Sequence, residues 1–195
     1  MTSQVLVSPD WIYIFLSSAI SGLTLPMYST YLMLWINSFV EKGVLADEND
    51  VKSAYVTINI WSTPVALMSV FLSMIIVDKV QPVWLIAPGF LLRSLCCALT
   101  LYVVNPTEWL ALAAISLFLF SSCTILQATM TAIHKNAPET ARGSILTIQA
   151  CAMSAGYFMF NGAAGILFDK SGPTAPFVVL GCLDLVLVIY TLTSH

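Results

Sequence analysis

Charged residues are few in this sequence, and long stretches have none. The 195 residues include seven Lys and Arg and ten Asp and Glu, 9% of the chain, whereas hydrophobic residues make up 58%. A soluble domain carries about 25% charged residues, because its surface must be hydrated. The remaining soluble alternative is a very apolar bundle, whose buried helices seldom exceed about 14 apolar residues. The scarcity of charge therefore argues strongly against a soluble fold.

Patterns typical of catalysis and of metal binding are also missing. The two histidines, His134 and His195, have no other metal-ligating residue at a usable spacing. The five cysteines lie inside apolar stretches and form no disulfide framework. No nucleophile beside a base, phosphate-binding glycine loop or pair of catalytic carboxylates is recognisable. We therefore expect no enzyme, no metal or other cofactor, and no binding of nucleic acid.

Apolar runs of about 20 residues or more fill the chain. Four runs contain no Asp, Glu, Lys or Arg, and two further runs contain one charged residue each. Each run is long enough to cross a hydrocarbon core of roughly 30 Å as a helix. Because backbone groups in lipid must be hydrogen-bonded internally, helices are the expected structure. The sequence predicts an all-α, polytopic membrane bundle over residues 1–195, a single domain with six transmembrane helices at about 11–40, 53–77, 82–104, 107–133, 143–168 and 173–193.

A nine-residue pattern occurs twice. Residues 74–82 read MIIVDKVQP and residues 165–173 read GILFDKSGP, sharing Asp-Lys and a final Pro at an offset of 91 positions. The first copy joins the second apolar run to the third, and the second copy joins the fifth to the sixth. Three runs separate the copies, which places them on opposite sides of the membrane. This arrangement predicts a 3+3 inverted-topology repeat.

The same offset relates the two charges inside the runs, Arg93 and Asp184. Each is the twelfth residue of its run, so both should lie near the middle of the membrane. An unpaired charge there costs at least about 2.5–3.5 kcal/mol. A two-fold axis in the membrane plane would bring equivalent positions of the third and sixth helices to equal depth. We therefore predict a buried ion pair between Arg93 and Asp184.

The short links resemble those of the C-terminal six-helix half of the major facilitator superfamily. Residues 165–173 are similar to that family's G-x-x-x-D-[RK]-x-G hairpin, residues 78–82 to its earlier counterpart, and residues 138–143 (PETARG) to its P-x-x-x-R-G turn. The family's transporters have twelve helices, so the resemblance covers one half. The residues carrying it are Asp78, Lys79, Gly165, Asp169, Lys170 and Gly172 in the hairpins, and Pro138, Arg142 and Gly143 in the turn.

The first hairpin departs from the family pattern. Met74 and Gln81 stand where the family has glycine, and Pro82 stands where it has a basic residue. In the family this loop helps the two halves to lock and slide, so its departures bring gating into question. The alternative interpretation of both Asp-Lys pairs is helix capping and anchoring at the membrane surface.

Two polar stripes mark the first and fourth predicted helices. Gly22 and Pro26 should kink the first helix near its middle. The resemblance implies that these two helices line a transport cavity. Polar residues on one face of a membrane helix fit that role, because they need water or polar partners. The alternative is interhelical hydrogen bonding, worth about 0.6 kcal/mol per bond. The candidate cavity-lining residues are Thr24, Tyr28, Tyr31, Ser116, Cys123, Gln127 and Thr131.

Two functions from different classes fit this sequence. The first is a transporter-derived accessory or structural subunit of a membrane complex. The alternative is one half of an active solute transporter, pairing with a second copy or a separate N-terminal half for alternating access. The expected partners are the lipid bilayer, another membrane chain and, for a transporter, a small-molecule solute. The resemblance implies termini on the cytoplasmic or matrix side of a plasma or mitochondrial inner membrane; the basic residues divide three to three and favour neither orientation.

Overall fold

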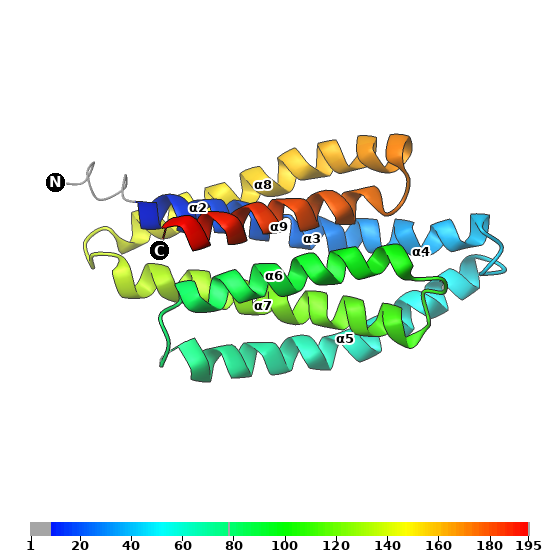
Figure 1. Cartoon of the computed structure of the whole chain (residues 1–195), viewed down its shortest axis with the longest axis horizontal. Coiled ribbons are helices and arrows are strands. Elements are labelled where there is room, and N and C mark those ends of the chain that lie inside the picture. Colours follow the sequence, from blue (N-terminus) through cyan, green and yellow to red (C-terminus); the bar gives the residue numbers. More distant parts are fainter. Residues whose placement is uncertain (1–8, 78, 195) are drawn as a thin grey trace.

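A computed structural model describes residues 9–77 and 79–194 of the chain, and Asp78 of the first hairpin lies outside the described residues. The expected all-α membrane fold is confirmed. Within the described part, six helices are long and apolar enough to span a membrane. They form one elongated bundle whose helices run roughly along its long axis (Figure 1).

The first span is divided into four segments, and the other spans are nearly continuous helices. Predicted and observed bounds differ mainly at the polar ends: the second helix begins five residues before 53 and the fifth ends three residues after 168. The bounds differ because the apolar runs predict only the part of each helix inside the hydrocarbon core, and the helices continue into the polar links. The elements are α2 (Pro9–Gly22), α3 (Thr24–Pro26), the π-helix η1 (Met27–Tyr31), α4 (Leu32–Glu41), α5 (Glu48–Val77), α6 (Val83–Leu99), the 3₁₀ helix η2 (Thr100–Tyr102), α7 (Trp109–Asn136), α8 (Arg142–Ser171) and α9 (Ala175–Ser194).

Asp47 explains the early start of α5. Its Oδ1 accepts hydrogen bonds from the backbone N–H of Asn49 at 2.8 Å and of Asp50 at 3.0 Å. The backbone N–H donors of Asp50 and Asn49 lower the pKa of the Asp47 carboxyl below its usual value. An acidic residue at this position satisfies the free N–H groups of the first turn, so the helix can begin in the polar link.

Consecutive helices alternate in direction. The start of α2 and the end of α9 lie at one end of the bundle, with the α5–α6 and α7–α8 links (Figure 1). The α4–α5, α6–α7 and α8–α9 links lie at the other end (Figure 1). The hairpin at Lys79 and the hairpin at Asp169–Lys170 therefore occupy opposite ends, each with exposed side chains. A two-fold relation between the two triplets of helices stays a prediction.

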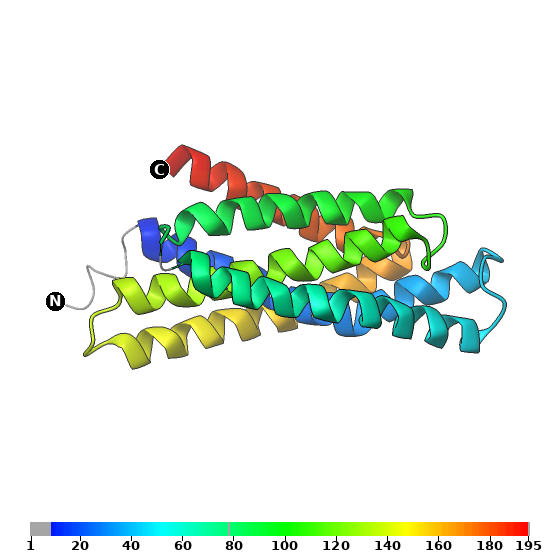
Figure 2. The ribbon, with the colours of Figure 1, turned by 90° about the horizontal axis from the view of Figure 1, so that it is seen from below.

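Four helix pairs make the main contacts of the bundle. The helix α7 packs on α5 and α6, α6 packs on α9, and α2 packs on α8. Figure 2 shows the same bundle turned by 90°, with part of the first span hidden behind α5. The largest core cluster gathers around Met27, Trp35 and Phe39 of the first span. The first span is thus the most enclosed of the six.

Two glycines hold α2 against α8. A Cβ added to Gly22 would overlap the carbonyl oxygen of Met153, and one added to Gly156 would overlap the carbonyl oxygen of Ala19. Backbone meets backbone at this crossing, with no side chain between the helices. Small residues allow such close approach in membranes, where weak Cα–H···O contacts recur at helix interfaces.

Replacing either glycine should open the crossing. We expect Gly22→Ala and Gly156→Ala each to destabilise the detergent-solubilised protein by about 1–3 kcal/mol, because the helices must move apart to admit a methyl group. Gly162→Ala is the matched control on α8, since nothing lies within 4 Å of its added Cβ. Thermal unfolding followed by circular dichroism measures all three. Equal stability of Gly156→Ala and Gly162→Ala would contradict the close approach.

Candidate functional site

The first span is irregular near its middle, where the hydrogen-bond pattern changes although the backbone at Leu23, Pro26 and Met27 stays in the helical region. The helix α2 ends at Gly22, and the N–H of Leu23 bonds to the carbonyl of Ile20, three residues back. Pro26 has no N–H to offer the carbonyl of Gly22, so the regular ladder cannot continue there. The chain resumes as a π-helix from Met27 to Tyr31. Single π-helical turns inside α-helices are frequent at functional sites.

A cavity of about 560 Å³ lies beside this irregular stretch. It is lined by the first span, α7 and α8, and its floor includes the Gly22–Met153 contact. This volume falls in the usual range of small-molecule sites, roughly 300–1,000 Å³. Hydroxyl groups are its main polar features. Its lining residues are Ser21, Gly22, Thr24, Leu25, Tyr28, Leu119, Ser122, Cys123, Leu126, Met153, Ser154, Tyr157 and Phe158.

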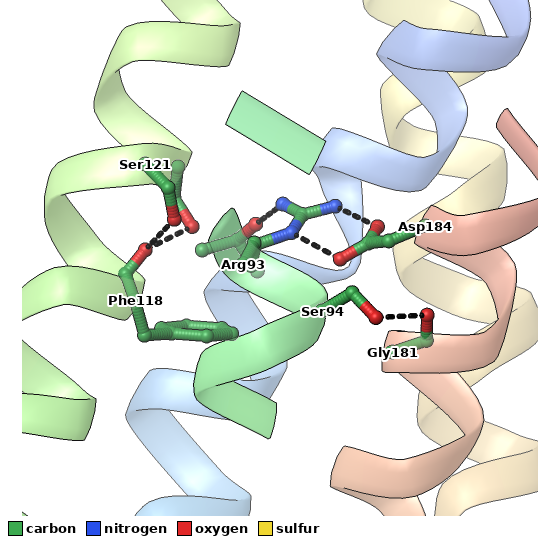
Figure 3. A network of polar contacts seen from close by, with 8 residues as sticks. Arg93, Ser94, Phe118, Ser121, Gly181 and Asp184 are labelled. Carbon is green, nitrogen blue, oxygen red and sulfur yellow. Dashed lines mark hydrogen bonds and ion pairs between the residues drawn. The ribbon is translucent and has the colours of Figure 1, made fainter. Parts of the chain in front are cut away.

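A buried ion pair joins α6 to α9. Arg93 donates from Nε to Asp184 Oδ2 at 2.9 Å and from Nη2 to Asp184 Oδ1 at 2.6 Å, and both side chains are fully buried. Figure 3 shows the two planar groups facing each other between the helices. The guanidinium also lies 5.1 Å from the centre of the Phe90 ring. Such a two-fold hydrogen-bonded pair neutralises both charges within the bundle.

The ion pair is connected to the first span. Arg93 Nη1 donates to Thr24 Oγ1 at 2.6 Å, and Thr24 is the first residue of α3. Ser94, the residue after Arg93, donates from Oγ to the carbonyl of Gly181, three residues before Asp184, at 2.9 Å (Figure 3). Thr24 also lines the cavity. Three elements, α3, α6 and α9, therefore meet at one polar point next to the cavity.

Two tyrosines of η1 fasten the span to opposite sides of the bundle. Tyr28 Oη donates to Asn59 Oδ1 of α5 at 2.7 Å and lies 3.0 Å from Ser62 Oγ. Tyr31 Oη donates to the carbonyl of Asn161 on α8 at 2.9 Å. The wider spacing of the π-helix places these two side chains toward different neighbours.

The structure separates the candidate cavity residues into two groups. Thr24, Tyr28 and Cys123 line the cavity. Tyr31 is buried against α8, and the three remaining candidates on α7, which are Ser116, Gln127 and Thr131, lie outside the lining. The stripe on α7 rotates around the helix, so only its part near Cys123 faces the first span.

Sequence reasoning did not find the contribution of α8. Met153, Ser154, Tyr157 and Phe158 line the cavity, although none of the candidate cavity-lining residues lay on this helix. The small residues Gly22 and Gly156 could have indicated this contribution, because their contact brings α8 against α2. Ser122 was also missed, because it lies beside Cys123 rather than at the spacing of the stripe.

The motif residues lie at the ends of helices. Gly172 ends α8 with a φ of 98°, a conformation that favours glycine, and its N–H bonds to the carbonyl of Phe168 at 3.1 Å. Gly165 lies inside α8 near the hydroxyl of Tyr31. Arg142 begins α8, Gly143 follows it, and Pro138 accepts a hydrogen bond from the N–H of Ala141. Gly172 thus caps α8 with its own backbone, and capping by the Asp-Lys pairs stays a prediction.

Comparison with known proteins gives one distant relative. The chain is 24% identical over 190 residues to the magnetosome protein MamH of Paramagnetospirillum magneticum (strain ATCC 700264 / AMB-1), a match that covers 97% of the chain and 44% of MamH. The chain thus spans less than half the length of this relative. No family model matches the chain, and no solved structure matches it. Together with the six spans, the comparison supports an integral, multi-pass, transporter-like membrane protein.

The ion pair leads to a double-mutant prediction. We expect Asp184→Leu to destabilise the protein by about 3–5 kcal/mol, because it leaves a buried guanidinium without its carboxylate. The double variant Arg93→Met/Asp184→Leu should be more stable than Asp184→Leu alone, since it removes both charges. Thermal unfolding in detergent measures the cycle, and Lys170→Met at an exposed helix end serves as control. Additive losses would show that the two side chains do not stabilise each other.

Proposed function

We propose that this chain is a transporter-derived subunit of a membrane complex, which docks through one face of α8 onto a second membrane-embedded bundle. The supporting observation is that α8 is the most exposed of the six spans but is not among the most hydrophobic. Only 11% of the most apolar part of α8 is buried within the bundle, against 50% for the first span, yet these two share the lowest mean hydropathy of the six. A helix that faced lipid on most sides should be among the most apolar.

One row of side chains on α8 supports a protein neighbour rather than lipid, although Phe158 and Met159 of the same helix are large, apolar and exposed at 72% and 77%. Exposed small residues recur every four positions along it, at Gly143, Thr147, Cys151 and Ala155. The helix α5, with 22% of its most apolar part buried, carries large apolar groups there, among them Trp61 and Phe71 at 62% and 66% exposure. Small residues at this spacing permit close approach of another helix. We call this row of four residues the α8 face.

The cavity bears on the choice between the two roles. Its lining has no Asp, Glu, Lys, Arg or His, so it offers no carboxylate or basic side chain for coupling to protons. This absence among the lining residues favours the accessory role. The cavity beside the irregular part of the first span favours the second candidate, one half of a solute transporter, because π-helical turns inside α-helices are frequent at functional sites.

The relative's length fits a two-bundle assembly. MamH is more than twice as long as the region that matches this chain. A second bundle of similar size, whether a separate chain or a second copy, would complete such an assembly. By family resemblance the second and fifth helices would face it. The small residues of the α8 face agree with that position, whereas the large exposed apolar side chains of α5, the second helix, fit lipid and do not.

The α8 face is tested by one substitution at two exposed cysteines. We expect Cys151→Trp on α8 to convert the native-gel species of the detergent-extracted protein from an assembly to a single bundle, since an indole would hold the helices apart. Cys182→Trp on α9 is the matched control, because Cys182 is also exposed but lies on another helix. A wild-type chain that migrates alone, or equal behaviour of both variants, would contradict the proposal.

The size of the assembly distinguishes the two roles. Migration within an assembly much larger than two bundles would favour the accessory subunit. A species of two bundles, with solute uptake after reconstitution into liposomes, would favour the transporter half.

A further inference from the structure

Several polar groups of the cavity already use their protons. Tyr28 Oη donates to Asn59 Oδ1 at 2.7 Å, and Ser122 Oγ donates to the carbonyl of Phe118 at 2.7 Å. Neither hydroxyl is free to donate to a molecule in the cavity. Ser154 and Tyr157 on α8 are more exposed members of the lining. The buried donors left for a ligand are therefore on the first span.

Ser21 and Thr24 are those donors. Ser21 is 8% exposed, and its Oγ has no hydrogen-bond partner among the described residues. A buried hydroxyl without a partner costs about 1–3 kcal/mol, which a ligand could recover. Thr24 Oγ1 accepts the proton of Arg93 Nη1, and its own proton enters no hydrogen bond within the described structure. Both residues line the cavity, on either side of the change in hydrogen bonding at Leu23.

Arg93 makes Thr24 a stronger donor without adding charge to the cavity. Hydrogen bonds polarise one another, so a hydroxyl that accepts from a guanidinium donates more strongly. The charge of Arg93 is neutralised by Asp184, and the side chains of both are fully buried. The cavity thus offers one polarised hydroxyl, that of Thr24, beside the hydroxyl of Ser21, within a mainly apolar lining that is open where Leu25 and Phe158 are exposed. An ion entering it would lose its hydration and gain no opposite charge.

We propose that the cavity binds an uncharged, mainly apolar molecule through an oxygen acceptor, such as a carbonyl, that takes hydrogen bonds from Thr24 and Ser21. The apolar part of the molecule would lie against Leu119, Leu126 and Met153. The proposed subunit role does not include a ligand of this class. Binding of the ligand does not depend on a partner at the α8 face. The ion pair would then contribute to ligand binding as well as joining α6 to α9, because Arg93 polarises the Thr24 hydroxyl that binds the ligand.

Benzophenone is a suitable probe. It is an uncharged aromatic ketone, and on illumination its carbonyl inserts into nearby C–H bonds of the protein. In native membranes containing the full chain, we expect saturable labelling of peptides that include Met153 or residues 119–126. The matched charged probe, benzophenone-4-carboxylate, should label these peptides at least about ten-fold less, because a charge gains no partner in the cavity.

Substitutions at the donors test the recognition step. We expect Thr24→Val and Ser21→Ala each to reduce the labelling about five-fold, the effect of one hydrogen bond of about 1 kcal/mol. Thr24→Ser should keep it, since it retains a hydroxyl. Thr30→Val is the control, because Thr30 lies on the same span outside the lining. Ser21→Ala decides the matter if Thr24→Val fails to fold, since Ser21 Oγ has no partner to lose.

Three results would overturn the proposal. They are equal labelling by the ketone and the carboxylate, unchanged labelling of Ser21→Ala, and labelling spread evenly over the exposed surfaces of α5 and α9. Failure of the α8 face is a separate outcome, because Cys151→Trp is read on native gels. The cavity proposal stands if that variant leaves the assembly unchanged while the probe behaves as expected.

Discussion

A buried ion pair in a medium that tolerates no isolated charge is the constraint on which the interior of this bundle depends. Arg93 and Asp184 stabilise each other only while α6 and α9 keep their register, and Arg93 reaches the first span through Thr24. Losing either partner would leave a charge with neither water nor counterion. The register of three elements is therefore coupled at one point, where the first span changes from α2 to α3.

The irregular stretch of the first span follows from local chemistry and has consequences across the bundle. Gly22 allows the backbone of α2 to touch α8, and Pro26 interrupts the helical ladder one turn later. The π-helix that follows directs Tyr28 toward α5 and Tyr31 toward α8. The cavity lies beside this irregular stretch, and Gly22 belongs both to its lining and to the contact with α8.

The outer surface indicates which helices face lipid and which face a protein partner. A lipid-facing helix needs large apolar side chains, and α5 has them, whereas the α8 face has small ones. Such a face fits a neighbouring helix better than lipid tails. The proposed partner and the proposed ligand thus concern different surfaces. One is outside on α8, and the other is inside between the first span, α7 and α8.

The sequence by itself determined the all-α membrane fold, because lipid excludes charge and unpaired backbone, and both leave plain signatures in composition. It also led to Arg93 and Asp184, since lone charges in apolar runs need partners and these two share the repeat's offset. Only the tertiary structure decided which hydroxyls face a cavity. Thr24 and Cys123 line it and Gln127 does not, because rotation of each helix and the close contact at Gly22 and Gly156 set the facing sides. Those rotations arise from packing between helices distant in the chain, which the periodicity of one helix does not contain.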